Sequence, residues 1–374
     1  MKIAYVVHDY HRFGGHSRYV AELATRYSKE HEVHVFANRI VDDGTSPIQF
    51  HTVPAWRANA LTTILSFILP ATFQVRGRGF DIVHSQGFCG LLGNVFTAHM
   101  VSRAWDQAIR KFEGSVSWRE SVFNTITSAL EYGVYRFPGS SQVIAVSERV
   151  RRDLVEHCHC PSHIHVIYHG TDVELFSPCV RQRCRTQARA GFGVPEREFA
   201  FLYVGNLRKG ARRCIQALAH VDEGILLCVS ATNPEPYRRF AEECGVAGRV
   251  IFASHTKQVE RAYAAGDAFL LPTPYDPFAL VVSEAMGCGL PVIVSREAGV
   301  AELIQHEVNG LLLDDVTSHT ELANHMRSLR HDPQRAESMG RAGRETVEGM
   351  SWDAVAAQTF RVYEDMLRGR GPAQ

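Results

Sequence analysis

Short apolar runs alternate with helix-like segments from the first residues of this chain, and this alternation limits the folds that it can adopt. In the first half, runs with the length of buried strands fall at residues 3–7, 33–37, 81–84, 95–98 and 143–146. The pattern restarts in the second half, at residues 200–204, 225–229, 250–252, 268–271 and 292–294. Strands that alternate with helices favour parallel sheets covered by helices. We therefore predict an α/β protein with two Rossmann-like halves.

The chain has 374 residues, which is too long for one ordinary hydrophobic core. The periodicity breaks near residues 168–195, where turn residues, two prolines and a run of arginines interrupt it. A last predicted helix, at 352–367, has no strand after it and can pack back on the first half. We expect an N-terminal domain of residues 1–170 joined by a helix at 352–370, and a C-terminal domain of residues 171–351.

Charge, cysteine content and the start of the chain narrow the class of protein. Lys plus Arg and Asp plus Glu number 40 each, so no excess of charge favours nucleic acid as a partner. Nine irregularly spaced cysteines, and a first strand with no cleavable signal pattern before it, indicate a cytoplasmic protein. The longest apolar stretch, residues 61–69, is far shorter than the roughly 20 residues of a spanning helix. We expect it to form a buried or lipid-facing surface helix that stops at Pro70.

The stretch from residue 267 to 295 carries the strongest indication of a ligand site. Asp276 and Glu284 lie around the start of a short helix, predicted at 278–286, between two buried strands. Pro277 stands where a helix start tolerates its missing N–H group. The amide groups and positive dipole end of such a helix face the crevice at the carboxyl ends of the strands, where anionic ligands bind. The sequence therefore predicts a phosphate-bearing ligand with hydroxyl groups at either end.

In each half, the turn after the first strand is a further candidate for binding phosphate. Gly14 and Gly15 come after the first strand, and glycines there let backbone amides approach a phosphate, although a tight turn without a ligand explains them equally well. Arg208 and Lys209 follow the strand at 199–204, where two cations suit a departing diphosphate. A solvated Arg-Lys turn is the alternative for that dipeptide.

Histidines and cysteines offer two more candidates. His99 stands just beyond the buried strand at 95–98, which we expect to end at the cleft between the two domains. His157, Cys158, Cys160 and His163 lie close together in the chain, but their spacing does not match a structural zinc site. We predict a role for His99 in the site and no bound metal.

Taken together, these motifs resemble the retaining glycosyltransferases of family 4, which have the GT-B architecture of two facing Rossmann-like domains with a cleft between them. The resemblance covers nearly the whole chain. It rests most on two acidic residues separated by seven, Asp276 and Glu284, and on the segment that follows them, Ala-Met-Gly-Cys-Gly-Leu-Pro-Val. Arg208-Lys209 and the Tyr-Asp-Pro-Phe run at 275–278 are similar to hexosyltransferases that build lipopolysaccharide core or other bacterial surface glycans.

The resemblance implies roles for eleven residues. Glu284 would hold the ribose hydroxyls of a nucleotide sugar and Asp276 the hydroxyls of the transferred sugar. Arg208 and Lys209 would stabilise the leaving diphosphate, and His99 would contact the sugar near its reacting carbon. The remaining contacts with the donor would come from Gly14, Gly15, Phe278, Ala279, Leu280 and Val281.

The activity implied is transfer of a hexose with retention, from a nucleotide sugar to a glycan, a lipid-linked or a small-molecule acceptor. A UDP-sugar is the expected donor, and neither a metal nor another cofactor is required. A nucleotide-sugar epimerase of the same architecture and a non-catalytic sugar-nucleotide-binding protein are the alternatives. Four departures from the family pattern put the donor sugar in doubt: Asp276 for Glu, Ala279 for Gly, Asn206 for Arg and His169 for Asn.

Peripheral contact with the inner face of the membrane is a further hypothesis. Indole and cationic side chains that suit an anionic interface lie in two adjacent predicted helices, at Trp105, Arg110, Lys111, Trp118 and Arg119. Asp106, Glu113 and Glu120 are interleaved with them, so a solvated helix face explains the same pattern.

Overall fold

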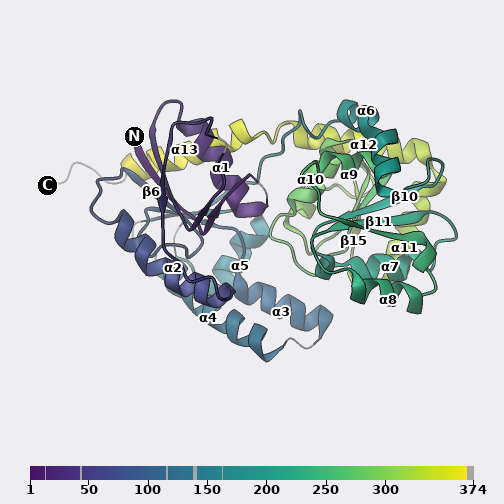
Figure 1. Ribbon diagram of the computed structural model, residues 1–374, viewed down its shortest axis with the longest axis horizontal. Coiled ribbons are helices and arrows are strands. Elements are labelled where there is room, and N and C mark those ends of the chain that lie inside the picture. The colour runs from purple at the N-terminus through teal and green to yellow at the C-terminus, as the bar shows by residue number, and fades with distance from the viewer. Residues whose placement is uncertain (13, 43, 115–116, 138–140, 162, 369–374) are drawn as a thin grey trace. The chain divides into compact units, whose positions relative to one another are not determined.

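The computed structural model describes residues 1–374 except 13, 43, 115–116, 138–140, 162 and 369–374. The chain divides into two compact units (Figure 1). Unit 1 comprises Met1–Gly170 and Trp352–Gln374, and unit 2 comprises Thr171–Ser351. Each unit is built on one large parallel sheet with helices on both faces, which confirms the predicted α/β class with two Rossmann-like halves.

Unit 1 contains a seven-stranded parallel sheet with the strand order β5-β3-β1-β6-β7-β8-β9. A separate pair of two-residue strands, β2 (Asp9–Tyr10) and β4 (Arg39–Ile40), lies beyond the ends of β1 and β3. The seven strands are β1 (Lys2–Val6), β3 (Glu32–Ala37), β5 (Ile48–Thr52), β6 (Ile82–Gln86), β7 (Val95–Ala98), β8 (Gln142–Ala145) and β9 (Ile164–Val166).

The two faces of this sheet carry different side chains, as expected from the alternation along each strand. Ala4, Val6 and Phe36 pack with Phe67 and Ala71 of helix α2 (Ala60–Val75) in one apolar cluster. The opposite face packs tyrosines and histidines against α1 (Gly15–Tyr27) and α13 (Trp352–Arg368), which lie together on that side (Figure 1). The other helices of unit 1 are α3 (Ser102–Glu113), α4 (Trp118–Arg136) and α5 (Glu148–Cys158).

Helix α13 is held on unit 1 by polar contacts within that tyrosine-rich layer. The hydroxyl groups of Tyr363 and Tyr5 lie 2.9 Å apart, and the Tyr27 hydroxyl donates to the carbonyl of Ala356 at 2.6 Å. A Cβ atom at Gly170 would lie 2.8 Å from the Cα of Trp352, so only glycine allows the chain to pass there. The last two residues of the helix predicted at 352–370 lie outside the described residues.

Unit 2 contains a six-stranded parallel sheet with the order β12-β11-β10-β13-β14-β15. Helices α7 (Ala211–Leu218), α8 (Glu235–Glu243) and α11 (His319–His331) cover one face, while α6 (Pro178–Phe192), α9 (Glu260–Ala265), α10 (Leu280–Gly287) and α12 (Pro333–Glu348) cover the other (Figure 1). The strands are β10 (Ala200–Val204), β11 (Ile225–Ser230), β12 (Val250–Ser254), β13 (Ala268–Leu271), β14 (Val292–Ser295) and β15 (Leu311–Leu313).

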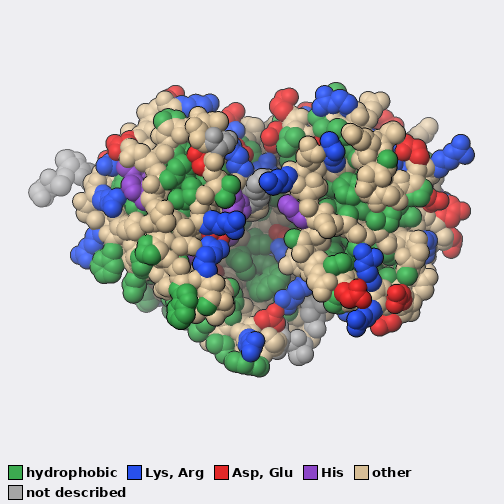
Figure 2. Space-filling model, viewed as in Figure 1, with side chains coloured by type: hydrophobic (Ala, Val, Ile, Leu, Met, Phe, Trp, Pro, Cys, Tyr) green, Lys and Arg blue, Asp and Glu red, His purple; other side chains and the backbone are tan. Residues whose placement is uncertain are grey.

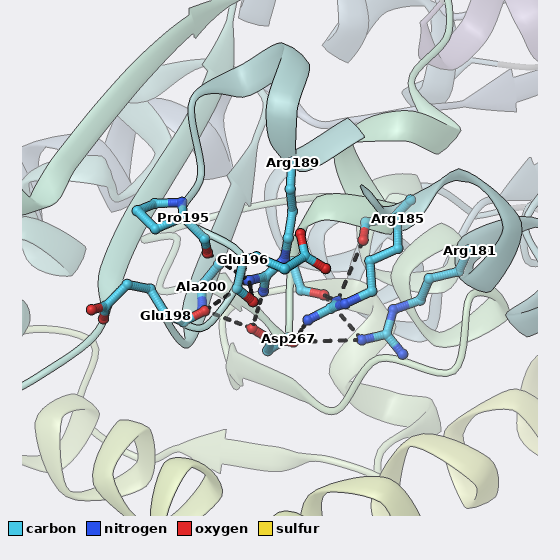
Figure 3. Close-up of polar contacts among 10 residues, drawn as sticks. Arg181, Arg185, Arg189, Pro195, Glu196, Glu198, Ala200 and Asp267 are labelled. Carbon is cyan, nitrogen blue, oxygen red and sulfur yellow. Dashed lines mark hydrogen bonds and ion pairs between the residues drawn. The ribbon is translucent and has the colours of Figure 1, made fainter. Parts of the chain in front are cut away.

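The break in regular structure predicted at residues 168–195 is wrong for most of that range, because helix α6 occupies residues 178–192. Three arginines of α6, four residues apart, point at one partly buried carboxylate, Asp267 (Figure 3). Arg185 and Arg189 lie 2.6 and 2.5 Å from its oxygens, and Arg189 also donates to three backbone carbonyls. The arginines therefore attach a helix to the start of β13, and Asp267 further accepts the amide of Ala200 in β10.

Two predicted helix boundaries also differ from the structure. The helix predicted at 278–286 begins only at Leu280, so Pro277 precedes it by three residues and is not its first residue. Pro70 does not end its helix, since α2 continues through it to Val75. Among the described residues, no helix is long and apolar enough to cross a membrane.

Candidate active site

The segment between β13 and α10 places Asp276 at the carboxyl end of the unit 2 sheet. Its conformation is fixed by backbone hydrogen bonds to the loop after β14. The amide of Asp276 donates to the carbonyl of Glu297 at 3.1 Å, and the Asp276 carbonyl accepts the amide of Gly299 at 2.8 Å. Val300 donates in the same way to Phe278. Two strand ends therefore hold the carboxylate in place, and no loop mobility is needed to present it.

Lys209 approaches Asp276 from the neighbouring strand. It ends the 3₁₀ turn η1 (Leu207–Lys209) that follows β10, and its ammonium lies 2.7 Å from Asp276 Oδ2. Gly210 makes this approach possible, because it adopts a φ of 129° and a Cβ there would lie 2.5 Å from the Pro272 carbonyl oxygen. The predicted cation and the predicted acid are thus brought together in one ion pair.

Ala279 is the last residue before α10 and adopts a left-handed conformation, with φ 72° and ψ 67°. This region is unfavourable for a residue with a Cβ and typical of glycine. The Asp276 carboxylate accepts the Phe278 amide at 3.2 Å, so this carboxylate binds both a lysine and the backbone that leads into the helix. The sharp turn at Ala279 leaves Leu280 and Val281 in the first turn of α10, whose amide groups have no partners within the helix.

Glu284 lies one turn further along α10 and is 6% exposed. Its Oε2 atom accepts the hydroxyl of Tyr263, from α9, at 2.7 Å. Tyr263 is fully buried, so it orients the carboxylate through a hydrogen bond shielded from water. This partner could not be predicted from the sequence, because nothing in the pattern of the short helix α9 distinguishes its tyrosine from a core residue.

Arg208 does not share the environment of Lys209. Its side chain is exposed, and its backbone amide donates to Asn206 Oδ1 at 3.0 Å, which caps the η1 turn. Asn206 also accepts the Thr232 hydroxyl at 3.3 Å. Asn206, which stands where many family members have arginine, therefore acts here as a cap that shapes the turn carrying both cations.

In unit 1, Gly14 and Gly15 form the start of α1: Gly14 is its N-cap and Gly15 its first residue. Gly14 has φ 82° and ψ 158°, a conformation open only to glycine. A Cβ at Gly15 would meet no described atom within 4 Å. Packing among the described residues therefore does not demand glycine at position 15.

His99 follows β7 and joins a group of aromatic rings in unit 1. Its Nε2 lies 2.8 Å from Oε1 of Gln86, at the end of β6. The rings of Tyr19, His169 and His16 have centroids 5.2, 5.5 and 5.6 Å from it, and the His169 ring stacks at 11°. Burial, and then the nearby histidines, hold the pKa of His99 well below its usual value. His99 is therefore neutral at pH 7 and can exchange hydrogen bonds with a sugar hydroxyl.

Of the four residues considered for zinc, His157 and Cys158 end α5, whereas Cys160 and His163 lie between α5 and β9. Among the described residues, no group of three or more His, Cys, Asp or Glu side chains is arranged to hold a metal ion. Burial raises the pKa of the Cys158 thiol to about 12, so the thiolate that binds metals is disfavoured.

The α3 and α4 side chains considered for membrane contact lie among carboxylates. Arg110 pairs with Asp106 at 2.7 Å, and the same aspartate accepts the amide of Asn124. Trp118 is 72% exposed and carries the guanidinium of Arg119 over its ring at 5.4 Å. The basic groups of this surface are thus partly neutralised.

The two sheets and their helices match the fold of solved glycosyltransferase structures. The fold is GT-B, as solved structures show. WaaG, a glycosyltransferase involved in lipopolysaccharide biosynthesis, superposes with a TM-score of 0.80 at 20% identity, over 98% of this chain and 100% of its own. HepE from Anabaena superposes with a TM-score of 0.71 at 19% identity, over 98% of this chain and 100% of its own.

Sequence comparison identifies the family. The model for glycosyl transferases group 1 matches residues 185–346, and the model for glycosyltransferase family 4 matches residues 13–175. The D-inositol 3-phosphate glycosyltransferase of Corynebacterium glutamicum is 30% identical over 310 residues, which cover 77% of this chain and 73% of that enzyme. The chain belongs to glycosyltransferase family 4. The predicted class is therefore confirmed: it is a retaining GT-B enzyme that transfers a sugar from a nucleotide-sugar donor.

Proposed function

We propose that the protein transfers a hexose from a UDP-sugar, with unit 2 binding the donor and unit 1 the acceptor. The observation that carries the proposal is the Lys209–Asp276 ion pair beside the start of the helix that bears Glu284. The structural relative HepE has been solved with UDP-glucose, which supports this choice of donor. The named relatives include an enzyme for D-inositol 3-phosphate and one of lipopolysaccharide biosynthesis, so a small-molecule, a glycan and a lipid-linked acceptor form the panel to test.

The donor contacts follow from the positions of the groups in unit 2. The backbone amides of Phe278 and Ala279, just before α10, and of Leu280 and Val281, in its first turn, would receive the sugar and the distal phosphate, since a helix start and its positive dipole end favour an anion. Glu284, oriented by Tyr263, would accept hydrogen bonds from two ribose hydroxyls. Asp276 would do the same for the hydroxyls of the hexose.

The transfer itself needs a charge-stabilised leaving group. Lys209, with Arg208 next to it, would neutralise the diphosphate as the bond to the sugar breaks. The oxygen of that diphosphate can take the proton of the acceptor hydroxyl as the new bond forms on the same face of the sugar, which retains the configuration. Gly14 and Gly15 would bring backbone amides to the diphosphate, and His99 would contact the hexose near the reacting carbon.

Product analysis separates this proposal from its alternatives. Incubation with UDP-glucose and an acceptor from the panel should give UDP and a glycoside whose anomeric proton, followed by NMR, keeps the α-configuration of the donor. Without acceptor, only slow hydrolysis is expected. Formation of an epimeric nucleotide sugar from donor alone would establish an epimerase. Tight donor binding without transfer to any acceptor would establish a binding protein.

Substitutions in the site test the roles of its residues. Lys209→Ala should lower transfer by about 10²-fold or more, as expected for loss of one charge-stabilising contact in a shielded site. Lys257→Ala, an exposed lysine of the same unit, is the matched control and should leave the rate unchanged. Near-normal turnover in Lys209→Ala would remove Lys209 from the mechanism.

The cytoplasmic location, with peripheral contact at the inner face of the membrane, stays a prediction. The surface first considered for that contact, on α3 and α4, carries carboxylates among its cations, and Arg110 is already paired with Asp106. If that surface binds membranes, Trp118→Ala should weaken co-sedimentation with anionic vesicles, and salt should weaken it further.

A further inference from the structure

Helix α2 of unit 1 presents an apolar face to solvent. Leu65, Leu69 and Phe73 are 45, 55 and 66% exposed, and their spacing of four residues puts them on one side of the helix. Phe67 and Ala71, on the other side, are buried against the sheet. Figure 2 shows hydrophobic side chains gathered over α2 on this face of the unit. A helix of a soluble domain normally directs polar side chains outward, so this arrangement is unusual.

Neighbouring segments extend the patch. Trp56 is 71% exposed, and its backbone amide donates to Ser66 Oγ of α2 at 2.8 Å. Leu91 is 46% exposed, and its amide donates to Thr72 Oγ1 at 3.1 Å. We call the exposed side chains of this region the α2 face: Trp56, Leu65, Leu69, Phe73 and Leu91.

The polar side chains of α2 form hydrogen bonds within the protein itself. The hydroxyls of Thr62, Thr63, Ser66 and Thr72 donate to backbone carbonyls at 3.0, 2.8, 2.6 and 2.7 Å. The amide of Gln74 donates to the Thr52 carbonyl at 3.2 Å. Because these groups already have partners, moving the helix out of water leaves none of its side-chain hydroxyls without an acceptor.

The segment that carries most of the α2 face has charges of one sign. Residues 44–80 contain no Asp or Glu, and α2 itself has no charged residue. Arg57 stands before the helix, and Arg76 and Arg78 follow it, all with exposed side chains. Arg57 pairs with Asp9 at 2.7 Å, so the two arginines after the helix carry most of the local positive charge. An apolar face bordered by cations matches the acyl and headgroup layers of an anionic bilayer.

We propose that the α2 face is a membrane-binding surface, which lies in the headgroup region of an anionic bilayer. A second copy of this chain fits the charges less well, because a two-fold contact through this face would bring the arginines of both copies together. The surface is separate from the α3–α4 hypothesis and does not depend on the chemistry proposed for unit 2.

Co-sedimentation of the full chain with vesicles tests the surface. We expect binding to vesicles of phosphatidylcholine with phosphatidylglycerol that exceeds binding to phosphatidylcholine alone and weakens with salt. The double variant Leu69→Gln/Phe73→Gln should bind at least about tenfold more weakly, since it removes two large apolar side chains from the contact. The matched control is Leu175→Gln/Val308→Gln, at 40 and 48% exposure in unit 2, which should bind as the wild type does. Arg76→Ala/Arg78→Ala should reduce the preference for anionic vesicles.

Tryptophan quenching locates the contact. With brominated lipids in the vesicles, Trp56→Phe should remove most of the quenching, whereas Trp118→Phe should leave it in place. Thermal melts and turnover with a water-soluble acceptor, expected to be unchanged in the variants, show that folding and catalysis are intact. The proposal is overturned by an absence of vesicle binding, by equal binding of Leu69→Gln/Phe73→Gln, or by quenching that is lost only with Trp118. A wild-type dimer that this double variant dissociates, without vesicle binding, would assign the face to self-association and overturn it as well.

Discussion

The ammonium of Lys209 lies 2.7 Å from Oδ2 of Asp276, so the cation proposed for the diphosphate is bound to the acid proposed for the sugar. The side chains are 30 and 12% exposed, which places the pair at the edge of the protein interior. A donor that carries both a diphosphate and a hexose can satisfy both partners at once. A nucleoside diphosphate alone can satisfy only the lysine and leaves the carboxylate beside a phosphate.

This relationship predicts opposite effects of one substitution on binding and on transfer. Asp276→Asn removes the negative charge that competes for Lys209, so UDP should bind several-fold more tightly. Transfer should fall by about 10²-fold, because the contact with the hexose is weakened. Titration calorimetry with UDP and initial rates with UDP-glucose measure the two effects. Asp222→Asn, an exposed aspartate of the same unit, is the control. Weaker UDP binding in Asp276→Asn would contradict the account.

Ala279 gives a prediction about stability. A left-handed alanine costs about 1–2 kcal/mol, while the extra freedom of glycine in the unfolded chain offsets part of that strain. We expect Ala279→Gly to raise the free energy of unfolding of unit 2 by about 0.5–1 kcal/mol, measured by urea denaturation. Ala357→Gly, at an exposed position inside α13, should lower stability by about 1 kcal/mol. Equal destabilisation by both substitutions would show that position 279 is not strained.

The arginine cluster on Asp267 predicts a large loss of stability. Asp267→Asn leaves the 1% exposed side chain of Arg189 without its counter-ion, which should cost about 3–5 kcal/mol. Asp353→Asn breaks another Arg–Asp pair, but Asp353 is 83% exposed, so the expected loss is at most about 1 kcal/mol. Comparable denaturation midpoints for the two variants would argue against a structural role for the cluster.

Much of the fold could be predicted from the sequence because its central strands are buried on both faces. The runs at 95–98, 200–204 and 268–271 match β7, β10 and β13 to the residue. Strand β15, a buried run of three leucines, was missed. Strands β5 and β9 were also missed, since as edge strands they are only half covered and include polar residues such as His51 and His165. Their alternation was too short to separate from a loop.

The missed helix α6 had a usable signal. Arg181, Arg185 and Arg189 recur every four residues, which places them on one helix face, whereas Pro178 and the run of charges suggested a break. In the site, the sequence located Asp276, Glu284 and Lys209 by their place after strands. It could not show that Tyr263 orients Glu284 or that Ala279 is left-handed, because both depend on how distant segments pack.

Two buried histidines predict how stability depends on pH. Burial lowers the pKa of His84 to about 3, and burial with nearby Arg18 lowers the pKa of His169 to about 3. In the unfolded chain both take a proton as the pH falls below about 6.5, whereas the folded state stays neutral. The contribution of these two neutral histidines to the free energy of unfolding is therefore complete above pH 6.5. It is lost as the pH falls from 6.5 toward 3, by up to about 1.4 kcal/mol per pH unit for each histidine.

Urea denaturation of wild type and His84→Gln between pH 7.5 and 5 checks this dependence. His84 bonds Tyr363 and Thr97 at 2.6 Å each, so the variant should be less stable at every pH. Its free energy of unfolding should also fall less steeply below pH 6.5, by up to about 1.4 kcal/mol per pH unit, because one histidine fewer takes up a proton on unfolding. Parallel pH profiles for the two proteins would contradict the neutral state assigned to His84.

The central claim is that the start of α10, with its two acids and Lys209, holds a nucleotide sugar. Titration calorimetry with UDP-glucose tests it most directly, on wild type, Glu284→Ala and the control Glu337→Ala at an exposed position of α12. Loss of charge-assisted hydrogen bonds to the ribose should weaken binding by about tenfold to a hundredfold in Glu284→Ala, with Glu337→Ala unchanged. Equal affinity for UDP-glucose in all three proteins would place the donor elsewhere and contradict the account.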